Sequence, residues 1–462
     1  MRLLPLGKLL RRRRDGNTTM KHDDTKPLLA EIYQAALAAV APGPVLVRAL
    51  RDEPPDPSRP SRPTNRRVWV IALGKAAQPM AEAAVGVLAA RGDAPAGGLV
   101  VAPVAGPQPH ASIPIVVGDH PEPGAGSLAA SEALDCLVRQ VSPDDAVWVL
   151  LSGGTTSLIG APQPGVSGPD LTALYAQLLR SGLDIKAMNR VRKRFTRWGA
   201  GRLARSLSHA AIVRCYIVSD VIGDDLASIG SGPCVADPST ATDVREALVG
   251  AGLWDGLAPA LQRYLDEVER GHVPETPKPG DHAVDRVESR LIATNQLALE
   301  AAGRRATELG LIPELVEPHI AGEASIVGSN IGRTVVARAR ERRSAPPHCI
   351  ILGGETTVTI RNLNAGLGGR SQELALAAAR ELRGEAPPTA LLAAGTDGRD
   401  GPTDAAGAIV NGGTWDRIGA AHRDPQQDLD RHDSYPALAA ADALIKTGPT
   451  GTNVMDIVLA IT

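Results

Sequence analysis

Glycine-rich turns that carry an arginine and two carboxylates form the most specific chemical pattern in the sequence. Gly353, Gly354 and Glu355 open this stretch, and Arg370 and Glu373 close it. An arginine held at a glycine-rich turn can bind a phosphate through two parallel hydrogen bonds. A surface Arg–Glu pair would explain the charges but not the glycines, so the stretch favours phosphate binding.

A second candidate phosphate site combines two glycines with hydroxyl side chains. Ser152, Gly153, Gly154 and Thr155 follow an apolar run, and such glycines let the backbone approach a ligand closely. N–H groups at the start of a following helix would complete an anion site. An ordinary serine–threonine cap explains the pattern equally well. A nucleophilic role for Ser152 is disfavoured because the GxSxG motif is absent.

Two acidic loops suit a hard metal ion. Asp220 and Asp397 each follow an apolar run, in loops that also contain glycine. Mg²⁺ takes one or two carboxylates and leaves its other positions to water and phosphate. Asx turns alone would also produce both loops, so metal binding is one of two interpretations of each.

Basic residues at two places in the sequence are candidates for binding an acidic substrate or a phosphate. Arg192 and Lys193 lie in a basic run on a predicted helix, which would close over such a substrate, although a solvated helix face is the commoner explanation. Lys75 follows a different apolar run, directly after Gly74. Only eight of the 49 basic residues are lysine, so a lysine at this position suggests a compact point charge for phosphate.

Apolar runs that end at glycine or small polar residues recur along the chain. We predict strands at residues 68–73, 115–117, 146–151, 215–218, 291–293, 349–352 and 390–394. Alanine-rich segments with helical spacing alternate with them at residues 76–90, 127–140, 296–309 and 371–382. This pattern predicts an α/β fold of two domains with mostly parallel sheets covered by helices. Ligands of such sheets bind beyond the carboxyl ends of the strands, where the candidate residues lie.

Composition marks the expected domain boundaries. Residues 1–27 are expected to form a disordered basic leader, with Met20 as an alternative start. A polar, proline-containing stretch at residues 271–285 predicts a linker. We therefore predict a Rossmann-like α/β domain at residues 28–270 and a second α/β domain at residues 286–462.

The composition also excludes several classes of function. A net charge of −2 gives no electrostatic attraction for nucleic acid or an anionic membrane, and no run of 18 apolar residues occurs. The four cysteines lack the spacing of a metal site or a disulfide scaffold. A cytoplasmic location is expected, and the oligomeric state stays open, with a homodimer as one assembly to test.

The known nucleotide-binding motifs are absent from the sequence or poorly placed in it. The P-loop pattern GxxxxGK[ST] does not occur. A GxGxxA pattern at residues 124–129 is separated from the preceding predicted strand by two prolines, whereas the dinucleotide fingerprint requires a tight strand-to-helix turn. The sequence therefore argues against nicotinamide binding.

Taken together, the motifs resemble one enzyme family. LGKAA, GDHPEP, LLSGGTTSL, SDVIGDDLASIGSGP, GGETTVTI, GLGGRSQE and GTDGRDGPTDAAGA occur in this order between residues 28 and 462. They are similar to motifs of the bacterial and archaeal glycerate 2-kinases, whose C-terminal module is called MOFRL. An older name for such sequences is hydroxypyruvate reductase.

The resemblance implies ATP-dependent phosphorylation of D-glycerate at its 2-hydroxyl, with a divalent ion, in a cleft between two α/β domains. It implies Lys75 and Arg370 as the functional lysine and arginine, which would neutralise the transferring phosphoryl group. Asp220 and Asp397 would orient Mg²⁺ or accept the hydroxyl proton, and the sequence leaves open which does which. Because Trp, Tyr and Phe number 5, 5 and 1, adenine is expected to be held by aliphatic side chains and backbone.

The chain departs from the family pattern at three positions. Arg194, Gly199 and Gly124 stand where the family commonly has a histidine, a lysine and an aspartate. These departures bear on substrate recognition more than on phosphoryl transfer. Two other functions stay open, an NAD(P)H-dependent hydroxypyruvate reductase and a non-catalytic nucleotide-binding regulator.

Overall fold

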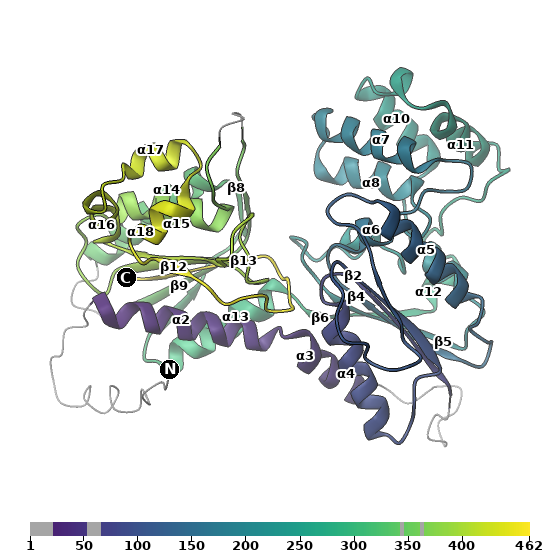
Figure 1. Cartoon of the computed structure of the whole chain (residues 1–462), viewed down its shortest axis with the longest axis horizontal. Helices are drawn as coiled ribbons and strands as arrows, with labels where there is room; N and C mark the ends of the chain where they lie inside the picture. The colour runs from purple at the N-terminus through teal and green to yellow at the C-terminus, as the bar shows by residue number, and fades with distance from the viewer. Residues whose placement is uncertain (1–21, 53–65, 342–345, 361–364) are drawn as a thin grey trace. The chain divides into compact units, whose positions relative to one another are not determined.

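The computed structural model describes residues 22–52, 66–341, 346–360 and 365–462, which form two compact α/β units (Figure 1). The first unit comprises residues 39–295 and 451–454. The second comprises residues 296–450 and 455–462 together with the described residues before residue 39. The predicted α/β class is confirmed.

The first unit contains a fully parallel sheet of six strands in the order β3-β2-β1-β4-β5-β6. Its strands are β1 (Val68–Leu73), β2 (Gly97–Ala102), β3 (Ile115–Val117), β4 (Ala146–Leu151), β5 (Ile212–Val218) and β6 (Val287–Ala293). Ile71 of β1 packs in a core with α5 (Ala125–Val138). Ala72 points to the opposite face and is also fully buried, and α4 (Ala77–Ala90) packs against β1. Burial on both faces explains why the central strands are almost wholly apolar.

Four helices of this unit build a separate apolar core, visible in Figure 1 as a group beyond one end of the sheet. They are α7 (Gly168–Arg180), α8 (Ile185–Phe195), α10 (Ala241–Gly250) and α11 (Pro259–Glu269). The remaining elements are α3 (Pro42–Arg51), α6 (Thr155–Leu158), α9 (Arg202–Ser206), α12 (His282–Asp285), η2 (Ile229–Ser231) and η3 (Trp254–Gly256).

The second unit contains a mixed sheet in the order β12-β11-β10-β13-β9-β7, with β8 also paired to β9. Its strands are β7 (Ile312–Leu315), β8 (Ile320–Glu323), β9 (His348–Thr357), β10 (Ala390–Gly395), β11 (Gly407–Asn411), β12 (Leu444–Ile445) and β13 (Asp456–Ile461). β7 and β8 run parallel to β9, whereas the other neighbours are antiparallel. The predicted parallel arrangement therefore holds for the first unit and not for this one, because no helix separates β10 from β11 and the chain reverses directly.

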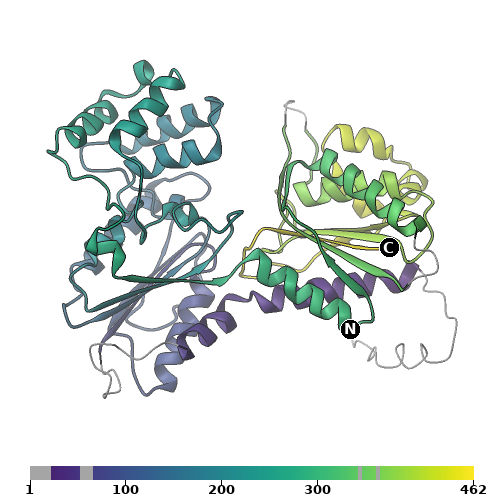
Figure 2. The same cartoon turned by 180° about the vertical axis from the view of Figure 1, so that it is seen from behind.

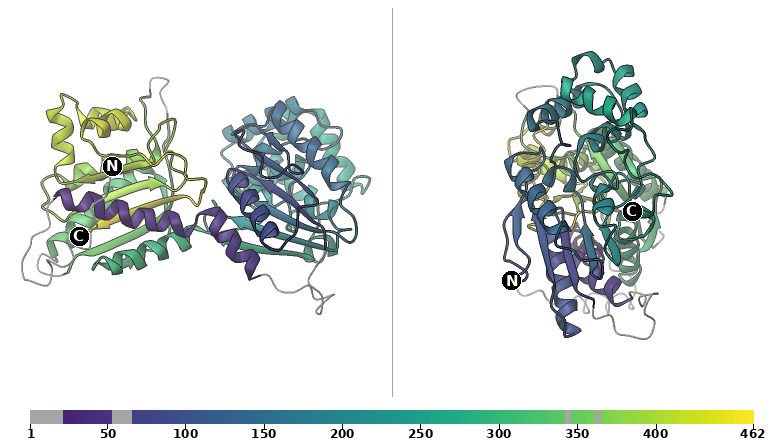
Figure 3. Two further views of the ribbon diagram at one scale, coloured as in Figure 1. Left: turned by 60° about the horizontal axis from the view of Figure 1, so that its bottom comes forward. Right: turned by 90° about the vertical axis from the view of Figure 1, so that its right-hand side faces the viewer.

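Helices cover both faces of this mixed sheet (Figures 2 and 3). On one face lie α14 (Ala324–Glu341), α15 (Arg370–Leu382), α16 (Thr414–Ala420), α17 (Pro425–Asp430) and α18 (Ser434–Ala440), which share one apolar core. Along the other face run α2 (His22–Ala39) and α13 (Asn295–Glu308).

The boundaries of the units differ from the predicted ones. β6 follows the predicted linker at residues 271–285 yet pairs with β5, so this stretch lies inside the first unit. α2 begins at His22, inside the predicted leader, and its Tyr33 hydroxyl donates a hydrogen bond of 2.5 Å to the carbonyl oxygen of Gly395. Residues 1–21, which include Met20, lie outside the described residues.

Membrane-spanning potential was assessed for the described helices. None of them is by itself long and apolar enough to cross a membrane. Two consecutive helical segments, Thr25–Ala39 and Pro42–Arg51, meet the criteria of length and composition when they are counted together, but a bend of 42° separates them.

Candidate functional site

The strand order of the first unit reverses between β1 and β4, the kind of position where open α/β sheets bind ligands. Lys75 follows β1, and residues 152–154 follow β4. The two loops are joined by hydrogen bonds, because the Lys75 N–H donates to Gly153 O at 2.9 Å and the Ala76 N–H donates to Ser152 Oγ at 3.0 Å. The parallel sheet thus brings together two loops that lie far apart in the sequence.

Close packing explains both glycines of the loop after β4. A Cβ atom added at Gly153 would lie 1.7 Å from Oδ2 of Asp220, which follows β5. Gly154 has a φ of +84°, and a Cβ there would lie 3.2 Å from Cδ2 of His120 and 3.3 Å from Cγ of Lys75. An ammonium group, an imidazole and a carboxylate therefore surround one glycine turn.

The electrostatics of this cluster follow from its burial. Burial raises the pKa of Asp220, and the positive charge of Lys75 opposes part of that rise. Burial lowers the pKa of His120, and Lys75 lowers it further, so this imidazole is neutral at pH 7. The side-chain amide of Asn453 lies 3.4 Å from Oδ2 of Asp220. The cluster thus holds one cation beside a carboxylate that binds protons more readily than usual.

The hydroxyl groups of Ser152 and Thr155 make hydrogen bonds to nearby backbone carbonyl groups. Ser152 Oγ donates to Leu73 O at 3.3 Å, and Thr155 Oγ1 donates to Ser152 O at 2.8 Å. These bonds agree with the serine–threonine turn that the sequence also allowed, and both side chains are buried. Any anion at this loop would therefore meet mainly backbone N–H groups.

The basic helix α8 supplies structural contacts. Lys193 is buried, and its Nζ pairs with Oδ1 of Asp237 at 2.9 Å. Arg194 is fully buried and pairs with Glu275 at 2.5 Å. The guanidinium of Arg192 lies 5.1 Å from the centre of the Tyr175 ring. Lys193 therefore has a structural partner, and its contact with substrate stays a prediction.

Arg370 is the centre of a second cluster, in the second unit. It begins α15, and its Nε and Nη2 donate to the two oxygens of Asp456 at 2.6 and 2.9 Å. Its Nη1 pairs with Oε1 of Glu355 at 2.5 Å. The antiparallel pairing places Asp456 opposite both Gly354 and Gly395, so the start of β13 lies beside the ends of β9 and β10.

Two features that suggested ligand binding here have structural causes. Gly354 has a φ of +138°, and an added Cβ would lie 2.3 Å from Ile320 O, so close pairing with β8 requires glycine. Asp397 accepts the Arg399 N–H at 3.0 Å, which is the Asx turn that the sequence left open. Asp397 nevertheless lies near enough to Asp456 to raise the pKa of that buried carboxyl further, after burial itself.

Asp400 positions the first turn of α15. Its two oxygens accept the N–H groups of Ser371 at 3.2 Å and Gln372 at 2.8 Å, which a helix leaves without internal partners. Burial and the nearby Asp456 charge raise the pKa of Asp400 to about 6. The same turn carries Arg370, so Asp400 helps to place its guanidinium.

Replacement of Asp400 should therefore affect both stability and the placement of Arg370. We expect Asp400→Ala to lower the free energy of unfolding by about 1–2 kcal/mol, because two backbone donors lose their acceptor. Thermal unfolding should be compared with Asp404→Ala, which removes an exposed aspartate of the same loop. Equal midpoints in the two variants would contradict the capping role.

Four residues of these clusters had no predicted role. His120 lies in the GDHPEP motif and Asp400 in the loop after β10, Asn453 precedes β13, and Asp456 begins it. An aspartate that opens an otherwise apolar run was the available signal for Asp456. For the other three, only the fold shows which groups of the clusters they contact.

The GxGxxA pattern lies at the wrong place for a dinucleotide. It begins α5, after β3, which is an edge strand of the sheet. The dinucleotide fingerprint belongs at the first strand-to-helix turn, which here carries Lys75. The structure therefore agrees with the sequence in arguing against nicotinamide binding.

A metal ion would have few protein ligands at either cluster. Within the described ranges, no three His, Cys, Asp or Glu side chains are grouped to hold a metal. Mg²⁺ with a nucleotide requires only one or two carboxylates, because phosphates and water supply the rest. The carboxylates of Asp220 and Asp397, each at a strand end, fit that requirement.

Comparison with known proteins relates the whole chain to one set of relatives. Residues 28–266 match the domain of unknown function DUF4147, and residues 348–456 match the MOFRL family. The chain is 39% identical to the glycerate 2-kinase of Pyrococcus horikoshii, covering 86% of this chain and 87% of that protein. A relative from Agrobacterium vitis, 37% identical with 96% of each chain covered, is provisionally named a hydroxypyruvate reductase. The crystal structure of glycerate kinase from Thermotoga maritima superposes with a TM-score of 0.82 at 35% identity, covering 95% of this chain and 99% of that one.

Proposed function

Because the chain belongs to the glycerate kinase family, with its DUF4147 and MOFRL modules, we propose that it transfers the γ-phosphoryl group of ATP to the 2-hydroxyl of D-glycerate. The observation that carries the proposal is Lys75 at the strand-order reversal, packed against a Gly–Gly turn and near a carboxylate of raised pKa. Phosphoryl transfer needs this combination of positive charge, backbone donors and a proton acceptor.

In the proposed reaction the 2-hydroxyl oxygen of glycerate forms a bond to the γ-phosphorus. The bond from that phosphorus to the β,γ-bridging oxygen breaks, and ADP leaves with the bonding electrons. Lys75 and Arg370 supply positive charge for the transferring phosphoryl group, which stays anionic throughout. The N–H groups of residues 153–155 hold the phosphates, because the Ser152 N–H already donates to Leu73 O. Residues 353–355, predicted as a glycine turn that binds phosphate, lie inside β9 and pair with β13 and β8, so their backbone groups belong to the sheet. Arg192 and Lys193 stay the proposed residues for the substrate carboxylate.

We propose different roles for Asp220 and Asp397, one in proton transfer and the other in metal binding. Asp220 accepts the hydroxyl proton, because its raised pKa makes it a stronger base than an ordinary carboxylate. Asp397 would hold Mg²⁺, which supplies charge neutralisation at the phosphates when bound. The composition supports small-molecule substrates and a cytoplasmic location, without nucleic-acid or membrane partners. A homodimer is the assembly to test by light scattering.

The test of the function is incubation with ATP, Mg²⁺ and D-glycerate, followed by phosphorus NMR. We expect ADP and 2-phosphoglycerate, and 3-phosphoglycerate alone would contradict the proposed position of transfer. Loss of 340 nm absorbance with NAD(P)H and hydroxypyruvate would instead support the reductase. ATP binding without ADP formation would support the non-catalytic regulator.

The base role of Asp220 predicts the direction of the pH dependence. The base must be ionised, so kcat/KM should fall as pH decreases through the pKa of Asp220, which lies above the ordinary 3.8. The acidic limb should therefore lie at higher pH than for an unshifted carboxyl group. Asp220→Asn should abolish this limb together with most of the activity. An unchanged acidic limb in that variant would assign the ionisation to another group.

A further inference from the structure

The outer edge of β9 is interrupted beside the second cluster. β7 pairs with β9 up to Leu315 opposite Ile351, and β8 resumes the pairing with Ile320 opposite Gly354. Residues 316–319 connect the two ladders and pass opposite Leu352 and Gly353 without strand pairing. The connection is two residues longer than the stretch of β9 that it passes, so it bulges away from the strand.

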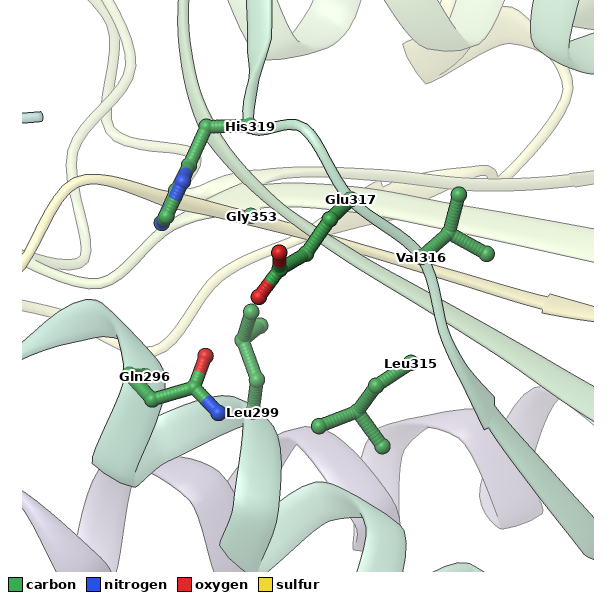
Figure 4. A pocket seen from close by; sticks show the side chains of 7 residues that line it. All are labelled: Gln296, Leu299, Leu315, Val316, Glu317, His319 and Gly353. Carbon is green, nitrogen blue, oxygen red and sulfur yellow. The ribbon is translucent and has the colours of Figure 1, made fainter. Parts of the chain in front are cut away.

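This bulge borders a partly open cavity of about 290 Å³ whose lining residues all belong to the second unit. Figure 4 shows Leu299 and Gln296 reaching in from α13 and Glu317 and His319 from the bulge. Leu315, Val316 and Gly353 complete the lining. Four of the seven lining residues are aliphatic or glycine, and the other three carry an amide, a carboxylate and an imidazole.

These groups suit a nucleoside better than an anion. Aliphatic side chains can cover the faces of a purine, and an amide can both donate to and accept from its edge. A carboxylate accepts hydrogen bonds from ribose hydroxyls but repels phosphate. The volume lies near the lower end of ligand pockets, roughly 300–1,000 Å³, which suits a base and ribose without the phosphates. The sequence also predicts an adenine held without aromatic stacking.

We propose that this cavity binds the adenosine end of ATP. The inference rests on the proposed kinase function and places one half of its co-substrate. Gly353 lines the cavity, and Glu355 lies two residues further along the same face of β9, about 7 Å away. Glu355 pairs with Arg370. A nucleotide seated in the cavity would thus extend its phosphates along the end of β9 toward that guanidinium.

The proposal is tested by filling the cavity at Leu315, whose side chain is 43% exposed and so tolerates enlargement. Leu315→Trp should raise the dissociation constant of ADP and the KM for ATP at least tenfold, a change of about 1.4 kcal/mol. The affinity for inorganic tripolyphosphate, which lacks the nucleoside, and the KM for glycerate should stay within twofold of wild type. Leu297→Trp is the matched control, because Leu297 lies on α13 at 39% exposure but does not line the cavity.

The possible results test the adenosine site and the proposed kinase function independently. Wild-type affinity for ADP in a folded Leu315→Trp variant overturns the adenosine site, whatever the activity. If the binding of ADP and of tripolyphosphate weakens equally, the adenosine site is also overturned, because the substitution then affects the binding of the phosphates. Weakened ADP binding in a protein that never phosphorylates glycerate keeps the site and rejects the proposed function. Glu317→Gln, which preserves shape, should weaken ADP binding without changing tripolyphosphate binding.

Discussion

Lys75→Ala is expected to lower kcat about a thousandfold while leaving the fold intact. The compact ammonium lies at the strand-order reversal, against the glycine turn proposed to hold the phosphates. Removal of one preorganised group that stabilises charge in the transition state typically costs 10²–10³ in rate, and a full positive charge lies at about the upper end. Steady-state kinetics with ATP and D-glycerate would measure the loss.

Two further variants test whether the loss of activity is specific to the lysine side chain at position 75. Lys75→Arg keeps the charge but should recover little activity, because Cγ of Lys75 already lies 3.3 Å from the position of a Cβ on Gly154, which leaves little room for a planar guanidinium. Lys446→Ala removes an exposed lysine that pairs with Asp404 and should keep wild-type kcat. The thermal midpoint of Lys75→Ala should move by less than about 3 °C. Near-wild-type kinase activity in this variant would reject the catalytic role.

Arg370→Ala is expected to lose both activity and stability. The resemblance implied that Arg370 is functional, and the structure in addition pairs Arg370 with the buried Asp456. Removal of one partner leaves a buried carboxylate without compensation, which costs 3–5 kcal/mol for a fully buried pair. Because the Arg370 side chain is 34% exposed, we expect about 2–3 kcal/mol here.

A double variant separates the two effects. Asp456→Asn in the Arg370→Ala background removes the uncompensated charge, so it should restore most of the lost thermal midpoint. It should not restore kcat, which we expect to stay at least a hundredfold below wild type. Recovery of kcat together with stability would mean that Arg370 acts only through the fold. Chemical denaturation and single-turnover kinetics on the same preparations would distinguish these results.

Local sequence patterns predicted the elements of the fold well where an apolar run was buried on both faces. The predicted strands at residues 68–73 and 146–151 coincide with β1 and β4, and the predicted helix at residues 371–382 lacks only the first residue of α15. The pairing of the second sheet was not predictable in this way. An apolar run shows that a strand is buried but not in which direction its neighbour runs, which depends on the connections.

The composition and motifs were sufficient to place Lys75, Asp220 and Arg370 at strand or helix ends and to suggest phosphate chemistry. Only the tertiary structure decided which groups surround them. It set Asp456 at the start of β13 against Arg370 at the start of α15, 86 positions earlier, and it buried Lys193 in an ion pair. The physical reason is that pKa and hydrogen bonding depend on distances of a few ångströms and on burial. Sheet pairing and packing set both, whereas the order of residues along the chain does not.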